Sequence, residues 1–261
     1  MNYLKKFLLS TVLSLSFISN AYSITLIPAT AKIEGNPGDI KVHNIQFVND
    51  SKITCDIDVK ASEIDFNSKG VRIYNNVSNK KNIIKNITFS PTNFVLKPGE
   101  SKNVNLNVKI PEGLKGSDDS MIFFTASPVY VDKYGKKSKM LIETSLGSLI
   151  MIYAKDTEII KSKIKSANIS SIKNKSLLAN LEVVNQGNCH IEGSGNIAVF
   201  SEDDKFITSF NIPKSIIYPG QNASLKGELK TKLNKGNYHA LITYQYGEDR
   251  NVVIDRPFEI K

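Results

Sequence analysis

Short runs in which apolar and polar residues alternate extend along most of the chain. Five such runs cover residues 45–48, 53–59, 104–110, 178–184 and 225–229. Turn clusters rich in Asn, Gly, Pro, Asp and Ser separate them, and no stretch combines a sustained 3.6-residue period with helix caps. An alternation of period two predicts half-buried strands, and many short strands with regular turns are typical of a sandwich or a barrel. We therefore predict an all-β fold.

One pattern occurs twice, 121 residues apart (219 − 98 = 121). Pro98-Gly99 leads to an alternating run, a Gly turn and an aromatic-rich strand, and Pro219-Gly220 leads to the same order. Val-Asn pairs ending at Asn49 and Asn185 precede these two corners. Pro fixes φ and Gly permits a positive φ, which suits a turn between sheets. The repeat predicts two tandem immunoglobulin-like β-sandwich domains, residues 24–157 and 162–261.

Residues 1–23 have the features of a cleaved signal peptide. Lys5 and Lys6 precede an apolar run of 12 residues, 7–18, and Ala21 and Ser23 are small residues at the −3 and −1 positions. That run is short for a permanent anchor, and no later stretch reads as a membrane span. We expect a mature chain of 238 residues (261 − 23) that is exported to the periplasm and has no permanent membrane span.

The net charge of +9 comes almost entirely from Lys, because only Arg72, Arg250 and Arg256 are Arg. Proteins that read nucleic acids usually cluster Arg for bidentate contacts, so we do not expect a nucleic-acid partner. The scattered Lys residues favour a solvated surface. Contact with an anionic cell-wall polymer stays open as an alternative.

The order of strands and turns also resembles a known family. It comprises an opening strand 24–33, Val48-Asn49, a segment 89–102 that contains Pro98-Gly99, strands 104–111 and 120–124, and a long last strand 140–153. This order is similar to the first domain of the PapD-like periplasmic pilus chaperones. It also resembles two-domain surface proteins that bind WxL-domain proteins and peptidoglycan.

The chaperone resemblance implies that the last strand of the first domain is lent to an incomplete client sandwich, with backbone hydrogen bonds along the edge. Met140, Ile142, Thr144 and Leu146 share one face of that strand by its period of two, and they are the candidate partner-binding residues. The alternative reading is that these side chains only cover the core of their own domain.

The resemblance further implies a pair of cations that anchors the carboxyl terminus of the client. The matching positions here hold Thr30 and Ile150, where the family has Arg and Lys. A shift of one or two residues brings in Lys32 or Lys155, and these two are the candidate cleft cations.

No constellation for catalysis or metal binding is evident. His43, His190 and His239 lie in separate segments, without the spaced partners of a zinc site. The acidic residues of Asp118-Asp119 and of 202–204 are interpreted as solvated turns. We therefore expect no enzyme activity, no metal and no cofactor.

The two Cys residues, Cys55 and Cys189, are predicted to occupy equivalent places in the two repeats. Buried free thiols are the favoured reading, and an interdomain or intermolecular disulfide stays open. For function, the leading hypothesis is an exported chaperone-like protein that binds secreted surface or pilus subunits by edge-strand donation. The alternative is a structural or adhesive envelope protein that binds a wall polymer or a partner protein.

Overall fold

The structure is a computed structural model that describes residues 24–66, 72–75, 83–131, 135–139, 142–172, 176–247 and 249–261. The predicted signal peptide, residues 1–23, lies outside this part of the chain. Within it, every element is a β-strand except the short 3-10 helix η1 (Ile83–Asn86). The all-β prediction is therefore confirmed. No helix among the described residues has the length and apolar character needed to cross a membrane.

Two sheets form the first sandwich. Its strands are β1 (Ile24–Ile27), β2 (Thr30–Gly35), β3 (Ile40–Asn49), β4 (Cys55–Phe66), β5 (Arg72–Asn75), β6 (Ile87–Ser90), β7 (Asn93–Leu96), β8 (Ser101–Lys109), β9 (Gly116–Val131), β10 (Lys137–Lys139) and β11 (Thr144–Ala154). One sheet has the order β1-β3-β8-β6. The other has the order β2-β11-β9-β4-β5, with β10 paired to β9 and β7 paired to β4.

The second sandwich also has two sheets. Its strands are β12 (Ser162–Ile172), β13 (Ser176–Asn185), β14 (Ile191–Ser201), β15 (Phe206–Ile217), β16 (Asn222–Lys230), β17 (Gly236–Tyr246) and β18 (Arg250–Ile260). The sheet orders are β12-β13-β16 and β15-β14-β17-β18. Each sandwich encloses its own apolar core, and Phe47 stacks on Phe124 in the first while Tyr244 is fully buried in the second.

The opening strand differs from the sequence prediction, which had a single strand over 24–33. The chain changes sheets at Pro28 and Ala29: β1 pairs antiparallel with β3, and β2 pairs parallel with β11 in the opposite sheet. Pro has no backbone N–H to contribute to a ladder, so it suits the break between two strands. The consequence is that β2 covers one edge of β11.

The two Pro-Gly corners have the same hydrogen bonds. Gly99 and Gly220 both have a positive φ, of 77° and 74°. The N–H of Gly99 donates to the backbone oxygen of Asn49, and that of Gly220 donates to the backbone oxygen of Asn185. Each Asn is fully buried, and its side-chain amide donates to two backbone carbonyls of its own domain. The predicted repeat is therefore a structural repeat.

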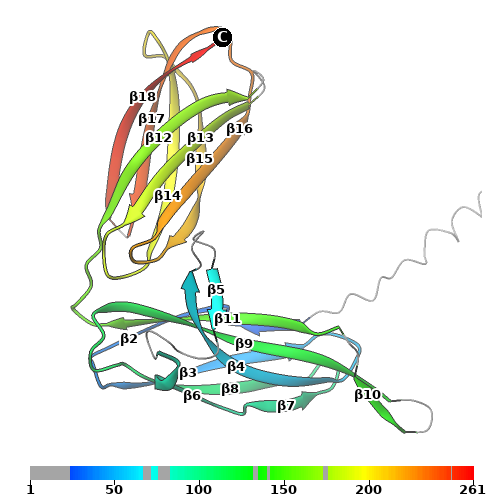
Figure 1. Cartoon of the computed structure of the whole chain (residues 1–261). Coiled ribbons are helices and arrows are strands. Elements are labelled where there is room, and N and C mark those ends of the chain that lie inside the picture. Colours follow the sequence, from blue (N-terminus) through cyan, green and yellow to red (C-terminus); the bar gives the residue numbers. More distant parts are fainter. Residues whose placement is uncertain are drawn as a thin grey trace, which may run out of the picture.

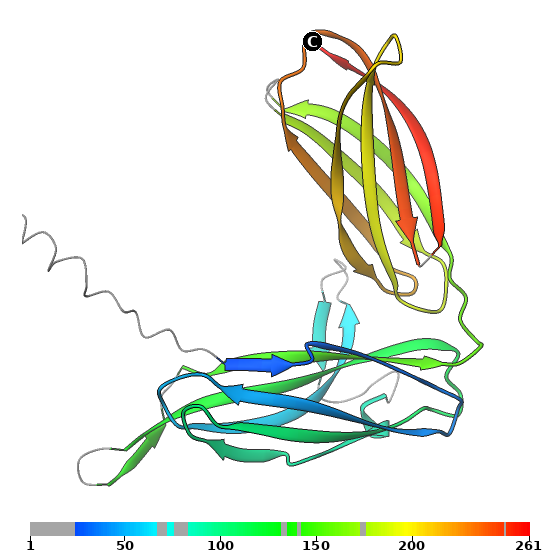
Figure 2. The ribbon, with the colours of Figure 1, turned by 180° about the vertical axis from the view of Figure 1, so that it is seen from behind.

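Figures 1 and 2 show the two sandwiches as the arms of an L, joined by the segment 155–161. The ends of β4 and β5 rise from the first sandwich toward the second. A small third apolar cluster joins the arms, because Tyr218 of the second sandwich packs with Ile64, Met121 and Leu149 of the first.

Candidate partner-binding site

The edge of β11 is covered along only part of its length. β11 pairs with β9 over all its residues, Thr144–Ala154, but β2 pairs with it only from Leu149 to Ala154. In the described part of the chain, no strand is paired with the outer side of residues 144–148. An open sheet edge presents backbone donors and acceptors to any extended segment that approaches it.

The direction of the backbone groups on this edge follows from the bonds to β2. The N–H of Leu149 donates to the carbonyl oxygen of Ala29 at 2.9 Å, so Leu149 directs its backbone groups outward. Because these groups alternate along a strand, Ser145 and Gly147 also direct their N–H and C=O outward. Leu146 and Ser148 direct theirs toward β9.

The predicted partner-binding residues are distributed over different environments. Met140 lies outside the described residues. Ile142 precedes β11 and its side chain is 67% exposed, while Thr144 is the exposed first residue of the strand. Leu146 is partly buried and packs against the core of the first sandwich. The last strand is thus shorter than the predicted 140–153, and Leu146 serves its own domain in this structure.

A small apolar pocket lies beside this end of β11. Its volume is about 160 Å³, and Ile142 and Thr144 form one side of it. Ile24 at the start of β1, Ala126 and Pro128 on β9, and Ser51 and Cys55 line the rest of it. The pocket is therefore at the same end of the sandwich as the open edge.

The two candidate cleft cations are in different positions. Lys32 extends from β2 on the face away from the core, where its Nζ is 4.7 Å from the ring centre of Tyr153 and 3.2 Å from Oε2 of Glu34. Lys155 is exposed in the turn after β11. Ile150, which matches the family's Lys, is fully buried in the core and pairs with Ala31. Thr30 and Ile150 therefore provide no cation at the two positions that the resemblance implies for the anchor.

A polar cluster at the domain junction was not predicted. Nδ1 of His190, just before β14, is 2.9 Å from Oδ2 of Asp119 on β9. The Tyr153 hydroxyl contacts Nε2 of the same ring, and the backbone N–H of His190 donates to Oγ of Ser117 at 3.1 Å. Asp119 is 4% exposed, so the interpretation of Asp118-Asp119 as a solvated turn was wrong.

The linker is held by further bonds across the junction. The N–H of Gly116 donates to Oγ1 of Thr157, and the N–H of Ser117 donates to the backbone oxygen of Asn188. The Asn188 side chain accepts from the N–H of Ile159 and donates to the carbonyl of Thr157. These bonds and the His190 cluster hold the start of β9 and the end of β11 against the second sandwich.

Burial raises the pKa values of several groups near this junction. Desolvation is the main cause for Tyr153, whose pKa rises well above its usual range, and for Cys189, whose pKa rises to about 11. Both Cys residues are buried and free. The prediction that their positions are equivalent was wrong. The buried Asn49 donates to the carbonyl of Ile53, and the corresponding Asn185 donates to that of Cys189, so Cys189 corresponds to Ile53 and not to Cys55.

All three His residues and both acidic segments, 118–119 and 202–204, lie among the described residues. Within them, no group of three or more His, Cys, Asp or Glu side chains is placed to hold a metal ion. The three His residues lie on β3, before β14 and on β17. The acidic segment 202–204 forms an exposed turn between β14 and β15, as predicted.

No protein-family model and no curated protein matches the sequence. Solved structures do match: the class 5 fimbriae chaperone CfaA is 16% identical, with a TM-score of 0.48, and the match covers 90% of this chain and 99% of that chain. The YadV chaperone is 14% identical, with a TM-score of 0.46, and the match covers 91% and 99% of the two chains. The E. coli chaperone DraB is 12% identical, with a TM-score of 0.41, and the match covers 92% and 98%. Each of these matches covers most of the length of both chains. The resemblance to WxL-binding surface proteins gains no support from these matches.

Proposed function

We propose that this chain is an exported chaperone-like protein that binds a secreted surface or pilus subunit by lending it the open edge of β11. The observation that supports this most directly is the uncovered stretch of residues 144–148, next to the exposed side chain of Ile142. β2 ends the open edge at Leu149, which limits the donated segment to the first half of the strand and the residues before it.

In this proposal, an extended strand of the client pairs with the outer side of β11. Ser145 and Gly147 supply the backbone hydrogen bonds, since their N–H and C=O groups point outward. Ile142 and Thr144, with Met140 before them, supply side chains to an apolar groove of the client. Leu146 remains packed against the core of the first sandwich, where it holds β11 in place, and it does not enter the client.

The export signal, the periplasmic location and the domain limits belong to the same proposal. Residues 1–23 act as the export signal, the mature chain works in the periplasm, and residues 24–157 and 162–261 are the two folding units. Lys32 lies within the β2–β11 pairing and Lys155 directly follows it, and the two are proposed to attract a negatively charged end of the client.

The test is co-purification of a tagged mature protein from the envelope fraction of its host, with identification of bound proteins by mass spectrometry. Ser145→Pro removes one outward N–H and places a ring on the open side, while the inward bonds to β9 are kept. Ser145→Ala is the matched control, because it retains the N–H. We expect Ser145→Pro to lose a stoichiometric small subunit that Ser145→Ala retains.

Equal recovery of the subunit with both variants contradicts strand donation. If the wild-type protein instead retains wall fragments and no subunit, the structural or adhesive alternative replaces the chaperone function.

A further inference from the structure

The sheet β1-β3-β8-β6 has an open edge along the first half of β3. β8 pairs with β3 over residues 40–48, but β1 pairs with it only over residues 46–49. In the described part of the chain, no strand is paired with the outer side of residues 40–45. The first sandwich therefore has a second uncovered edge, separate from that of β11.

The backbone groups of this edge point outward at every second residue. The oxygen of Asp39, just before β3, accepts from the N–H of Ile110, just after β8, so Asp39 directs its C=O toward β8. Because the direction alternates along a strand, Ile40, Val42 and Asn44 direct their N–H and C=O groups to the open side. These three residues thus offer donors and acceptors to an extended segment.

Three large aliphatic side chains lie around these groups on the outer face of the sheet. The exposed fractions are 53% for Ile27 at the end of β1, 65% for Ile40 and 68% for Val42. Val42 lies opposite the uncharged Asn107 on β8, and Ile40 lies opposite Lys109. Apolar side chains beside unpaired backbone groups make an edge that another strand can join.

The adjacent edge of the other sheet, on β2, has the opposite character. Its exposed residues Lys32 and Glu34 form an ion pair, with 3.2 Å between Nζ and Oε2. Charged side chains on an edge strand disfavour pairing with another chain. On β3, the Lys41 side chain is bonded to Asp39 at 3.2 Å and lies beside Gly35 of β2, so it does not cover the outer face of the β3 edge.

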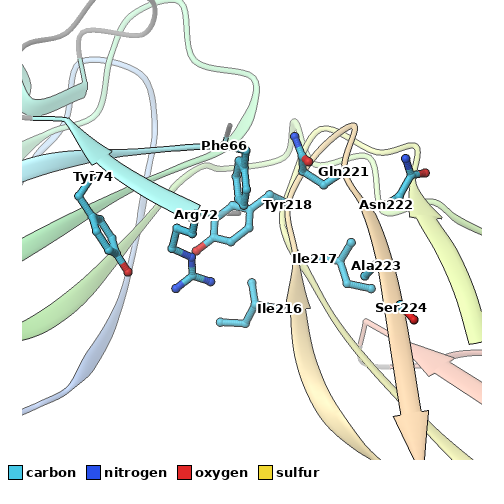
Figure 3. A pocket seen from close by; sticks show the side chains of 10 residues that line it. All are labelled: Phe66, Arg72, Tyr74, Ile216, Ile217, Tyr218, Gln221, Asn222, Ala223 and Ser224. Atoms are coloured by element: carbon cyan, nitrogen blue, oxygen red, sulfur yellow. The ribbon is translucent and has the colours of Figure 1, made fainter. Parts of the chain in front are cut away.

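The described part of the second sandwich does not cover this edge. Figure 3 shows its corner, with Tyr218, beside Phe66 and Arg72 at the ends of β4 and β5. β4 and β5 belong to the other sheet of the first sandwich. Figures 1 and 2 show the sheet of β3 and β8 on the side away from the second sandwich.

We propose that residues 40–44 of β3 pair antiparallel with the same residues of a second copy of this chain, with Val42 on the two-fold axis. The outward groups are symmetric about Val42: the two Val42 residues bond to each other, and Ile40 of each copy bonds to Asn44 of the other. This pairing makes about six backbone hydrogen bonds, and two-fold symmetry is the commonest symmetry of protein dimers.

A second copy also covers the three exposed aliphatic side chains. Ile27 pairs with Gln46 at the end of β1, and the next position on the same face, opposite Asn44, is occupied by Ile40 of the second copy. Ile27 of each copy therefore contacts Ile40 of the other, and the two Val42 side chains contact each other. One partner of identical sequence thus covers the whole exposed apolar border.

The ends of the pairing are free of obstruction. The N–H of Gly38 donates to the oxygen of Ile110 at 2.8 Å, so the turn before β3 bends toward β8 and away from the open side. Residues 144–148 of β11 take no part, because Ile24, which lines one pocket with Thr144, pairs with the last residue of β3. The dimer leaves the proposed client edge open and does not depend on the proposed function.

The test is sedimentation velocity of the mature protein over a range of concentrations under reducing conditions. We expect a reversible dimer with a dissociation constant of roughly 10–100 μM, as for small interfaces. Val42→Lys places like charges opposite each other on the axis and should weaken the dimer roughly tenfold or more. Thr88→Lys is the matched control, because Thr88 is exposed on the same face, on β6, two strands away from the edge.

Disulfide formation locates the axis. Val42→Cys places two Cα atoms about 5.5 Å apart across the axis, which a disulfide can span. Asn107→Cys, one strand further from the axis in each copy, separates them by roughly 14 Å. We expect Val42→Cys to form a linked dimer roughly tenfold faster than Asn107→Cys, as measured on non-reducing gels. The native Cys55 and Cys189 are buried and free, so they do not interfere.

A monomer at all concentrations up to roughly 500 μM overturns the proposal. A dimer that Val42→Lys does not weaken, or equal rates of disulfide formation in the two Cys variants, also overturns it. Ser145→Pro, which disturbs the open edge of β11, should leave the dimer intact. A dimer that Ser145→Pro dissociates and Val42→Lys does not is formed through β11 and contradicts pairing through β3.

Discussion

At the residue scale, a buried Asn organises the corner of each sandwich. Asn185 is fully buried, and its amide donates to the carbonyls of Cys189 at 2.7 Å and Ile217 at 2.8 Å. Its Oδ1 accepts from the N–H of Gly187. One side chain thus satisfies three backbone groups at the corner, and the backbone oxygen of Asn185 accepts from the N–H of Gly220.

Asn185→Ala should be strongly destabilising, because it leaves two buried carbonyls and one N–H without their partner. We expect a loss on the order of 2–4 kcal/mol in the free energy of unfolding, measured by urea denaturation. Asn196→Ala is the control: Asn196 bonds to Asn211 on the exposed face of β14, and its loss should change stability by less than about 0.5 kcal/mol. Similar losses of stability for both variants would contradict a structural role for the Asn185 hydrogen bonds.

The buried thiols should be unreactive in the folded protein. Burial raises the pKa of Cys55, and it raises that of Cys189 to about 11, so very little thiolate exists at pH 8. We expect iodoacetamide to leave both residues unmodified in the native state and to alkylate both in urea, as measured by intact mass. Thr144→Cys, an exposed position, is the positive control and should react under native conditions. Alkylation of Cys189 at the rate of that control contradicts the buried location.

At the element scale, the sequence predicted the strands better than their partners. The alternation within 104–110 and 178–184 matches β8 and β13, because a half-buried strand leaves that pattern locally. The pairing of β2 with β11 joins residues 119 positions apart, Thr30 and Leu149 (149 − 30 = 119), and leaves no local pattern. The burial of Asp119 also leaves no local pattern. Its neighbours Gly116 and Ser117 have the composition of a turn, and its partner His190 lies 71 positions away (190 − 119 = 71).

The half-covered edge of β11 should be visible in amide hydrogen exchange. The N–H groups of Leu146 and Ser148 point toward β9, and that of Leu149 bonds to Ala29, so all three should be protected. The N–H groups of Ser145 and Gly147 face the open side and should exchange faster by about two orders of magnitude or more. Heteronuclear NMR resolves these residues individually. Uniform protection from 145 to 149 would mean that another segment covers the edge.

At the scale of the whole molecule, the two sandwiches meet through very close backbone contacts at β9. Gly116 has a φ of 82°, and a Cβ at this position would overlap the backbone oxygen of Asn188 in the second sandwich. Gly99 has a similar φ of 77°, but a Cβ there would meet nothing within 4 Å. The two glycines therefore separate the cost of backbone strain from the cost of disturbing the junction.

Gly116→Ala should loosen the junction, and Gly99→Ala should not. Both variants incur about 1–2 kcal/mol of strain from the left-handed backbone, so both should show lower urea midpoints. Only Gly116→Ala also displaces Asn188, whose side chain holds Ile159 and Thr157 in the linker. Trypsin should then cut at Lys155 or Lys161, which lie in that linker, about tenfold faster than in the wild type. Mass spectrometry of the two domain-sized fragments gives the rate. Equal cutting rates in the two variants would show that the junction between the two sandwiches does not depend on this contact.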